Sequence, residues 1–178
     1  MKTYLQILLS AIVALVFVAC KHFNMFKADI VQTNTIQQQM LSLNDTSLKK
    51  LVKIDSEWKK DLTENQYYIL RKKETERPFQ NEFNDNHKKG NYFCAGCKLP
   101  LFSSETKFNS GTGWPSFYAP INKNRVIEVA DKSHGMVRGE IICARCDGHL
   151  GHLFDDGPNP TGLRYCMNSG AMLFQKIK

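Results

Sequence analysis

The chain has 178 residues, of which 42% are hydrophobic and 23% charged, and its formal net charge is +7 at pH 7. These proportions are typical of a globular protein and predict one folded domain with appendages. The positive charge raises the question of nucleic-acid binding. The lysines, however, are scattered from Lys2 to Lys178 among acidic residues, and no basic block of five or more occurs. We therefore expect no nucleic-acid partner.

The first twenty residues have the pattern of an export signal. A short positive start precedes an apolar run from Ile7 to Ala19, which only Ser10 interrupts. The run is shorter than the ~20 residues that a membrane span needs, and it fits the apolar region of a secretory signal. The following Cys20 resembles the acylated cysteine of a bacterial lipoprotein signal. An uncleaved anchor and a plain cleavable signal are the alternatives.

We accordingly predict a signal peptide over residues 1–19 and a lipid on Cys20. The lipid would anchor the exported protein to the cell envelope, on the periplasmic or the outer-surface side. Residues 20–47 are predicted to form a flexible spacer, because the stretch 31–39 is polar, uncharged and without an apolar period. The folded domain is predicted over residues 48–178.

Within the domain, helices are expected before strands. A first helix is expected from Asp45, because the apolar residues of 48–52 fall at helical spacing. A second is expected after Thr63, a residue type that caps helices. Short runs rich in β-branched and aromatic residues predict strands at 91–93, 125–129, 139–142 and 171–174. The expected class is mainly β with N-terminal helices (α+β).

Four of the six cysteines form two Cys-x-x-Cys pairs, Cys94 with Cys97 and Cys143 with Cys146. Two intervening residues let both thiolates of a pair bind one ion, and two pairs complete the tetrahedron that structural Zn²⁺ prefers. We predict one structural zinc ion per chain. Two disulfides are the alternative, since oxidising compartments favour them. A closed site of four cysteines leaves no open position, so the predicted metal is not catalytic.

Cys166 is the cysteine left after the pairs and the predicted lipid site are assigned. Arg164 precedes it by two residues in a probable strand, so both side chains are expected on one face. A nearby cation lowers the pKa of a thiol and raises its thiolate fraction. The residues alone favour a buried, unreactive cysteine as the alternative.

Four motifs together resemble the B-type methionine sulfoxide reductase family, and the two cysteine pairs match its zinc-bearing members. The resemblance extends from about Glu57 to Phe174, with the motifs in order. They are Gly111–Phe117 (GTGWPSF), Ser133–Met136 (SHGM), His149–Pro158 (HLGHLFDDGP) and Arg164–Ser169 (RYCMNS).

This resemblance implies a domain of two antiparallel sheets with zinc far from the reactive cysteine. It also implies reduction of the R epimer of methionine sulfoxide, free or in proteins. The family's nucleophile falls on Cys166 and its activating arginine on Arg164. Trp114 and Phe154 correspond to the aromatic substrate contacts. The polar groups around the sulfoxide oxygen correspond to His149, His152 and Asn168.

These residue types suit the chemistry that the resemblance implies. A thiolate attacks the sulfoxide sulfur, and the departing oxygen needs a proton, which histidine can donate near neutral pH. Cys166 then becomes a sulfenic acid. Either Asp155 or Asp156 is expected to support the histidines, and the sequence leaves open which.

The chain departs from many family members at Thr112. The resolving cysteine of those members stands between the glycines of the Gly-x-Gly-Trp-Pro-Ser motif, where this chain has Thr112. We therefore expect an external reductant, a thiol or a thioredoxin-like protein, to reduce Cys166 directly.

Two other functions are compatible with the sequence. One is a zinc-ribbon binding module, which would need no reactive thiol. The other is a thiol redox sensor, which would react with peroxide faster than with sulfoxide. We expect a monomer that repairs oxidised proteins of the cell envelope.

Overall fold

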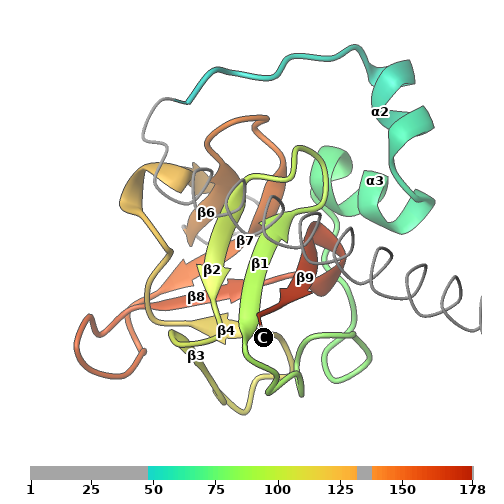
Figure 1. Cartoon of the computed structure of the whole chain (residues 1–178). Coiled ribbons are helices and arrows are strands. Elements are labelled where there is room, and N and C mark those ends of the chain that lie inside the picture. The colour runs from blue at the N-terminus through green and yellow to red at the C-terminus, as the bar shows by residue number, and fades with distance from the viewer. Residues whose placement is uncertain (1–47, 132–137, 178) are drawn as a thin grey trace, which may run out of the picture. The chain divides into compact units, whose positions relative to one another are not determined.

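The computed structural model describes residues 48–131 and 138–177. Two helices come first and the strands follow (Figure 1). The helices are α2 (Asp55–Asp61) and α3 (Glu64–Lys72). The strands are β1 (Gly90–Cys94), β2 (Pro100–Ser103), β3 (Lys107–Phe108), β4 (Ser116–Phe117), β5 (Val126–Asp131), β6 (Arg138–Cys143), β7 (His149–Phe154), β8 (Arg164–Met167) and β9 (Met172–Lys176). Short 3₁₀ helices are η1 (Lys123–Arg125) and η3 (Ser169–Ala171).

The strands form two antiparallel sheets, which confirms the predicted mainly β class. One sheet has the order β2-β1-β9, and the other has the order β3-β4-β8-β7-β6-β5. The smaller sheet lies across the larger one in Figure 1. The four predicted strand regions coincide with β1, β5, β6 and β9, apart from shifts of one or two residues at their ends.

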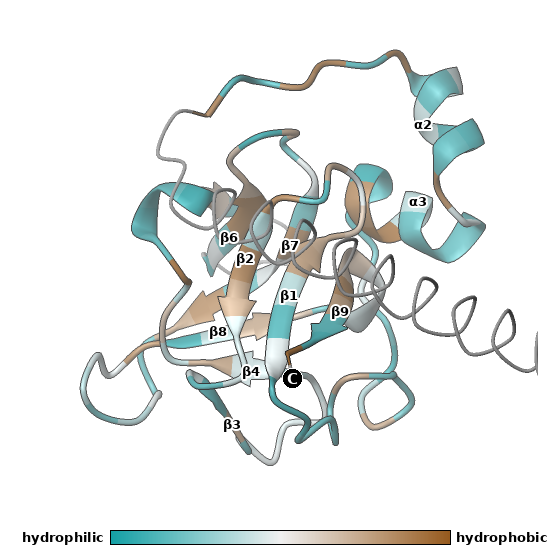
Figure 2. Cartoon of the chain, viewed as in Figure 1, coloured by the Kyte–Doolittle hydropathy of each residue, from teal (hydrophilic) through white to brown (hydrophobic). Residues whose placement is uncertain are grey.

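Aromatic side chains join the two sheets. Phe102 of β2 stacks on Phe117 of β4 with ring centroids 4.5 Å apart, and Tyr92 of β1 contacts Phe117 edge-on at 5.0 Å. All three are fully buried, and such ring pairs add stability beyond the area that they bury. Figure 2 shows hydrophobic segments on β2, β6 and β8, whereas α2 and α3 are largely hydrophilic. The core lies between the sheets and extends to the inner sides of the helices, where Trp58, Ile69 and Leu70 are buried.

The second predicted helix is confirmed, and the first is wrong over its described part. Thr63 caps α3, with its hydroxyl accepting from the Gln66 amide and the Gln66 side chain accepting from the Thr63 amide. Residues 48–54 form no helix. Leu51 instead donates its amide hydrogen to the carbonyl of Arg145, at 2.8 Å. This bond to a distant loop satisfies the backbone outside a helix, and the first helix of residues 48–131 starts at Asp55.

A buried carboxylate connects the end of α3 to the larger sheet. Glu140 in β6 is 3% exposed and accepts hydrogen bonds from Lys73, which ends α3, and from Nδ1 of His149 in β7, each at 2.8 Å. Burial raises the pKa of Glu140, but the bonds from Lys73 and His149 outweigh burial and leave that pKa below its usual value. The ionised carboxylate therefore stabilises the junction of three elements.

We predict that Glu140→Gln lowers the free energy of unfolding at about pH 7.5 by about 2 kcal/mol, because it removes the charge from a buried hydrogen bond with His149 and from a partly buried one with Lys73. Urea unfolding followed by tryptophan fluorescence measures the change. The matched control is Glu128→Gln on the neighbouring strand, where the carboxylate is exposed, with an expected change below about 0.5 kcal/mol. Equal effects of the two substitutions would contradict the buried-junction account.

The same junction predicts a pH dependence. Burial lowers the pKa of His149, against the raising effect of Glu140, so the folded state binds this proton more weakly than the unfolded state. The resulting stability is present above about pH 6.5 and is lost as the pH falls toward the folded pKa. Acidification should therefore lower the free energy of unfolding. In the Glu140→Gln variant this free energy should fall at least as steeply with pH, because loss of the carboxylate lowers the His149 pKa further.

Candidate active site

Strand β8 holds the candidate nucleophile in the middle of the larger sheet. It pairs with β4 on one side and β7 on the other, and Cys166 lies directly across from Ser116 and from His152. This double pairing fixes the backbone on both sides of Cys166. The thiol is partly exposed and free.

A pocket of about 190 Å³ opens at Cys166. It brings together five of the predicted site residues, Trp114, His152, Phe154, Cys166 and Asn168. The sequence analysis missed the other lining residues, Thr75, Arg138, Gly151 and Met167. The walls are thus partly aromatic and partly polar, with a thiol between them. This combination suits a small group with an apolar methyl and a polar oxygen.

A β-bulge brings His149 and His152 together. Residues three apart in a regular strand face opposite sides, but the pairing of β6 with β7 shifts between Ile141 and Ile142, which leaves Leu150 as the extra residue. The two rings consequently lie edge to face, with centroids 5.3 Å apart. His149 is 2% exposed and does not line the pocket.

Gly151, within this bulge, allows β7 to approach β8 closely. A Cβ atom on Gly151 would lie 2.1 Å from the carbonyl oxygen of Cys166, which is backbone and cannot move aside. Only glycine fits at this position beside the candidate nucleophile.

The carboxylates that support the histidines are not those expected. His149 is bonded to Glu140, and Nε2 of His152 lies 3.0 Å from Asp131. Asp156 instead makes two hydrogen bonds with the Arg164 guanidinium, at 2.7 and 2.9 Å. Glu140 and Asp131 lie outside the histidine motif, on the two preceding strands, nine residues from His149 and 21 residues from His152. These contacts depend on how the strands pair, so the motif itself gave no sign of them.

Arg164 is held on both sides. Besides its bonds to Asp156, its guanidinium lies over the Phe154 ring, 4.2 Å from the centroid. Burial raises the pKa of Cys166, and the Arg164 charge lowers it, together with hydrogen bonds from Thr112 and Ser116. The net shift is upward. Arg164 therefore acts in the predicted direction, but it does not overcome burial by itself.

Glu76, which the sequence analysis did not single out, connects Trp114 to Asn168. Its carbonyl accepts from Trp114 Nε1 at 3.0 Å, and its amide donates to Asn168 Oδ1 at 3.1 Å. Its carboxylate accepts from the amides of Ser169 and Gly170. Asn168 also donates through Nδ2 to the Leu150 carbonyl, at 3.2 Å. The amide of Asn168 thus has a structural role in addition to lining the pocket.

The two cysteine pairs meet at one point. Their four Sγ atoms lie within 4.8 Å of one another, with Cys94 and Cys146 at 3.6 Å and Cys97 and Cys143 at 3.5 Å. A tetrahedron with metal–sulfur bonds of about 2.3 Å has sulfur–sulfur edges of about 3.8 Å. Within residues 48–131 and 138–177 all five cysteines are free thiols. The cluster fits a metal ion and disfavours the disulfide alternative.

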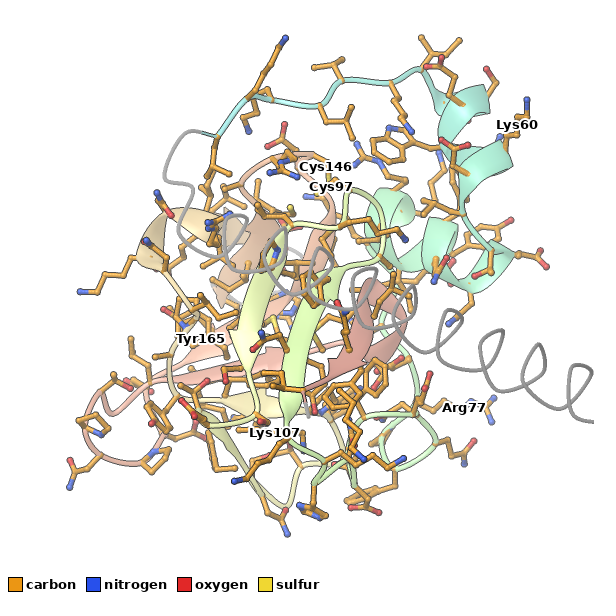
Figure 3. All side chains as sticks on the ribbon, in the orientation of Figure 1. Lys60, Arg77, Cys97, Lys107, Cys146 and Tyr165 are labelled. Atoms are coloured by element: carbon orange, nitrogen blue, oxygen red, sulfur yellow. The ribbon has the colours of Figure 1, made fainter. Side chains whose placement is uncertain are left out.

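The two pairs also have the same backbone geometry. In each, the amide of the first cysteine donates to the carbonyl five residues on, Cys94 to Leu99 and Cys143 to Gly148. The residue after each second cysteine has a positive φ, 60° at Lys98 and 55° at Asp147. Figure 3 shows Cys97 and Cys146 close together, well away from Tyr165, the neighbour of Cys166. The cluster is therefore remote from the pocket.

Some predicted features lie outside the described residues. They are the Ser133–Met136 motif, the signal peptide over 1–19, the lipid site Cys20 and the spacer up to residue 47. In the described part of the chain, no helix is long and apolar enough to cross a membrane.

Comparison with known proteins identifies the family. A family model described as the SelR domain matches residues 62–176. The chain is 57% identical over 122 residues to "Peptide methionine sulfoxide reductase MsrB" of Pseudomonas putida (strain GB-1), covering 68% of this chain and 93% of that protein.

Proteins of the same name in two further bacteria are similar. The one of Hahella chejuensis is 54% identical over 127 residues (71% of this chain, 91% of that protein), and the one of Leptospira interrogans is 56% identical over 124 residues (70% and 95%). These matches confirm the resemblance seen in the motifs: the chain belongs to the MsrB family of peptide methionine sulfoxide reductases, which are oxidoreductases.

Proposed function

We propose that this protein reduces methionine-R-sulfoxide, free or in proteins, to methionine through a sulfenic acid on Cys166. The observation that carries the proposal is the pocket itself, in which a free thiol lies between an indole, a phenyl ring and an imidazole. Membership of the family supports the reaction class.

The proposed reaction balances with the groups present. The Cys166 thiolate attacks the sulfoxide sulfur and forms an S–S bond, the oxygen takes up one proton from the site and passes from that sulfur to Cys166 Sγ, and the S–S bond breaks to release methionine. The sulfoxide is thereby reduced by two electrons, and Cys166 is oxidised by two electrons to a sulfenic acid. Trp114 and Phe154 supply the apolar wall for the S-methyl group, and the polar groups lie on other parts of the wall. A pocket with one apolar side and one polar side distinguishes the R epimer from the S epimer.

His152 is the proposed proton donor. Its Nε2 is occupied by the bond to Asp131, so Nδ1 is the nitrogen available for proton transfer. His149, in edge contact with His152 and bonded through Nδ1 to Glu140, would hold the His152 ring in place. Asn168 has one side-chain amide hydrogen that its structural bonds do not use, and this hydrogen would orient the sulfoxide oxygen or a water.

An external reductant would regenerate Cys166. Thr112 Oγ1 lies 3.9 Å from Cys166 Sγ, so a hydroxyl stands where a resolving thiol would react. The other thiols of the described residues belong to the remote cluster. Two external thiols would reduce the sulfenic acid to the thiol with release of water and a disulfide, and a thioredoxin-like protein could supply both.

We further propose that the cysteine cluster, Cys94, Cys97, Cys143 and Cys146, holds one structural Zn²⁺. Four sulfur ligands in matched turns fit zinc, which such sites coordinate completely. The bound ion would join the β1–β2 turn to the β6–β7 turn, and it would take no part in the reaction.

Location at the cell envelope, through a lipid on Cys20, is also a proposal. It rests on the apolar run and the cysteine that follows it, and repair of oxidised envelope proteins would be the corresponding role. Mass spectrometry of the mature N-terminus tests it. A chain that retains Met1, or that begins beyond Cys20, would contradict the lipid anchor. We propose that the protein acts as a monomer, which its mass in solution would test.

Turnover of the separated sulfoxide epimers tests the proposed reaction. With dithiothreitol as reductant, the zinc-loaded protein should reduce only the R epimer of a methionine sulfoxide peptide, and Cys166→Ser should abolish turnover because serine is no soft nucleophile. Chromatography of the separated epimers measures product. Glu128→Gln, on the exposed face of β5, is the control that should keep full activity.

Each of three outcomes would contradict this assignment and would lead to a different conclusion. Reduction of neither epimer by folded protein would favour a binding module. Turnover that survives in Cys166→Ser would place the nucleophile elsewhere. Faster oxidation of Cys166 by peroxide than by sulfoxide would favour a redox sensor.

The metal content of the protein tests the proposed zinc site. Purified protein should contain one equivalent of zinc, and Cys143→Ser should lose it and unfold at a much lower temperature, because structural zinc contributes on the order of 10 kcal/mol to folding. Elemental analysis and thermal unfolding measure both effects. Cys166→Ser, the same substitution outside the cluster, should retain zinc. Well-folded protein with less than about half an equivalent of metal would contradict the site.

A further inference from the structure

Beside Cys166 lies a set of hydroxyl side chains that do not line the pocket. Three hydroxyls, those of Ser110, Thr112 and Ser116, form a connected hydroxyl cluster beside the thiol. Ser110 Oγ lies 2.8 Å from Thr112 Oγ1 and 2.8 Å from Ser116 Oγ. Thr112 Oγ1 is 3.9 Å from Cys166 Sγ, within hydrogen-bond distance for sulfur.

Two backbone elements hold the hydroxyl cluster against the thiol. Ser116 is fully buried in β4 and is the direct cross-strand partner of Cys166. Thr112 lies in the turn before β4, between Gly111 and Gly113, which have φ angles of 71° and 90°. These left-handed conformations favour glycine, and they turn the chain so that Thr112 comes back to the sulfur.

The donors of the hydroxyl cluster can be counted. Each hydroxyl has one hydrogen and can accept as well. The 2.8 Å contact between Ser110 and Thr112 also uses one hydrogen, so Thr112 keeps its own hydrogen for Cys166 when Ser110 donates to Thr112 and Ser116 donates to Ser110, in place of the longer 3.2 Å bond from Ser116 to the Trp114 carbonyl. In this order each hydroxyl donates once, and Ser110 also accepts from the Thr112 amide at 3.4 Å. When Cys166 is protonated, the Thr112 hydroxyl can turn and accept from the thiol.

We propose that the hydroxyl cluster holds Cys166 as the reactive thiolate, with Thr112 as the direct donor and Ser110 and Ser116 as positioning residues. The proposal rests on the function proposed above, in which this thiolate attacks the sulfoxide. Arg164 supplies charge from β8, whereas the hydroxyl cluster supplies a directed hydrogen bond from a different element. In this chain, Thr112 thus has a role of its own at the position where a resolving cysteine stands in many family members.

The hydroxyls act on the pKa of Cys166 in the direction that this arrangement requires. Burial has the largest effect and leaves the pKa raised, while Arg164, Thr112 and Ser116 each act to lower it and so offset part of the effect of burial. The charged and titratable groups around the thiol are Arg164 on β8, His152 on β7 and Arg138 on β6. A change at Thr112 leaves all three in place, so it isolates the contribution of the hydroxyl cluster.

The test measures the pH dependence of Cys166 alkylation by iodoacetamide, in the zinc-loaded full chain and without any sulfoxide. Mass spectrometry of the Cys166 peptide gives the rate between about pH 6 and 10. Thr112→Val, which keeps the side-chain shape, should move the midpoint upward by about one pH unit, so that the thiolate fraction near neutral pH falls about tenfold. Thr112→Ser, which keeps the hydroxyl, should keep most of the thiolate fraction of the unsubstituted protein.

Ser110→Ala is the second variant, because it removes a member of the hydroxyl cluster that does not touch the sulfur. It should move the midpoint in the same direction by less. Unchanged midpoints in Thr112→Val and Ser110→Ala, or an equal shift in Thr112→Val and Thr112→Ser, would overturn the proposal. Since alkylation needs no sulfoxide, these results are independent of the turnover assay and distinguish failure of this proposal from failure of the proposed function.

Discussion

The antiparallel pairing of β8 with both β4 and β7 is the constraint on which the site depends. Because Cys166 lies across from Ser116 and from His152, one position of the sheet brings a hydroxyl and an imidazole to the thiol. The absence of a side chain at Gly151 permits the close approach of β7 and β8. Trp114 and Thr112 then reach the site from the turn that leads into β4. The site is therefore rigid where the strands pair, as a reaction between closely placed atoms requires.

Carboxylates hold the basic groups around this strand. The buried Glu140 accepts from both His149 and Lys73. The partly buried Asp131 contacts both His152 and Arg138, and the exposed Asp156 binds Arg164. Glu76 holds the pocket from the other direction by bonding Trp114 and Asn168 at once. The remote cysteine cluster joins turns of the two sheets. Its proposed zinc would stabilise the scaffold and leave the chemistry to Cys166.

The sequence predicted local features well and long-range contacts poorly. Strand runs, the Thr63 cap and the two cysteine pairs are encoded within a few residues, and each was found. The helix expected over 48–52 failed because Leu51 bonds to Arg145, nearly a hundred residues away. Either Asp155 or Asp156 was expected to support the histidines, yet the contacts of Glu140 and Asp131 arise from strand register and a bulge. Pocket residues such as Trp114 and Cys166 were found through the family resemblance, not through periodicity.

The most direct test of the account is a single turnover in the absence of any reductant. Protein mixed with excess R sulfoxide should form one equivalent of methionine and then stop. A sulfenic-acid reagent such as dimedone should label Cys166 once and label no other cysteine. A disulfide between Cys166 and one of the four clustered cysteines would contradict the one-cysteine reaction. Methionine formed without any modification of Cys166 would contradict the account as a whole.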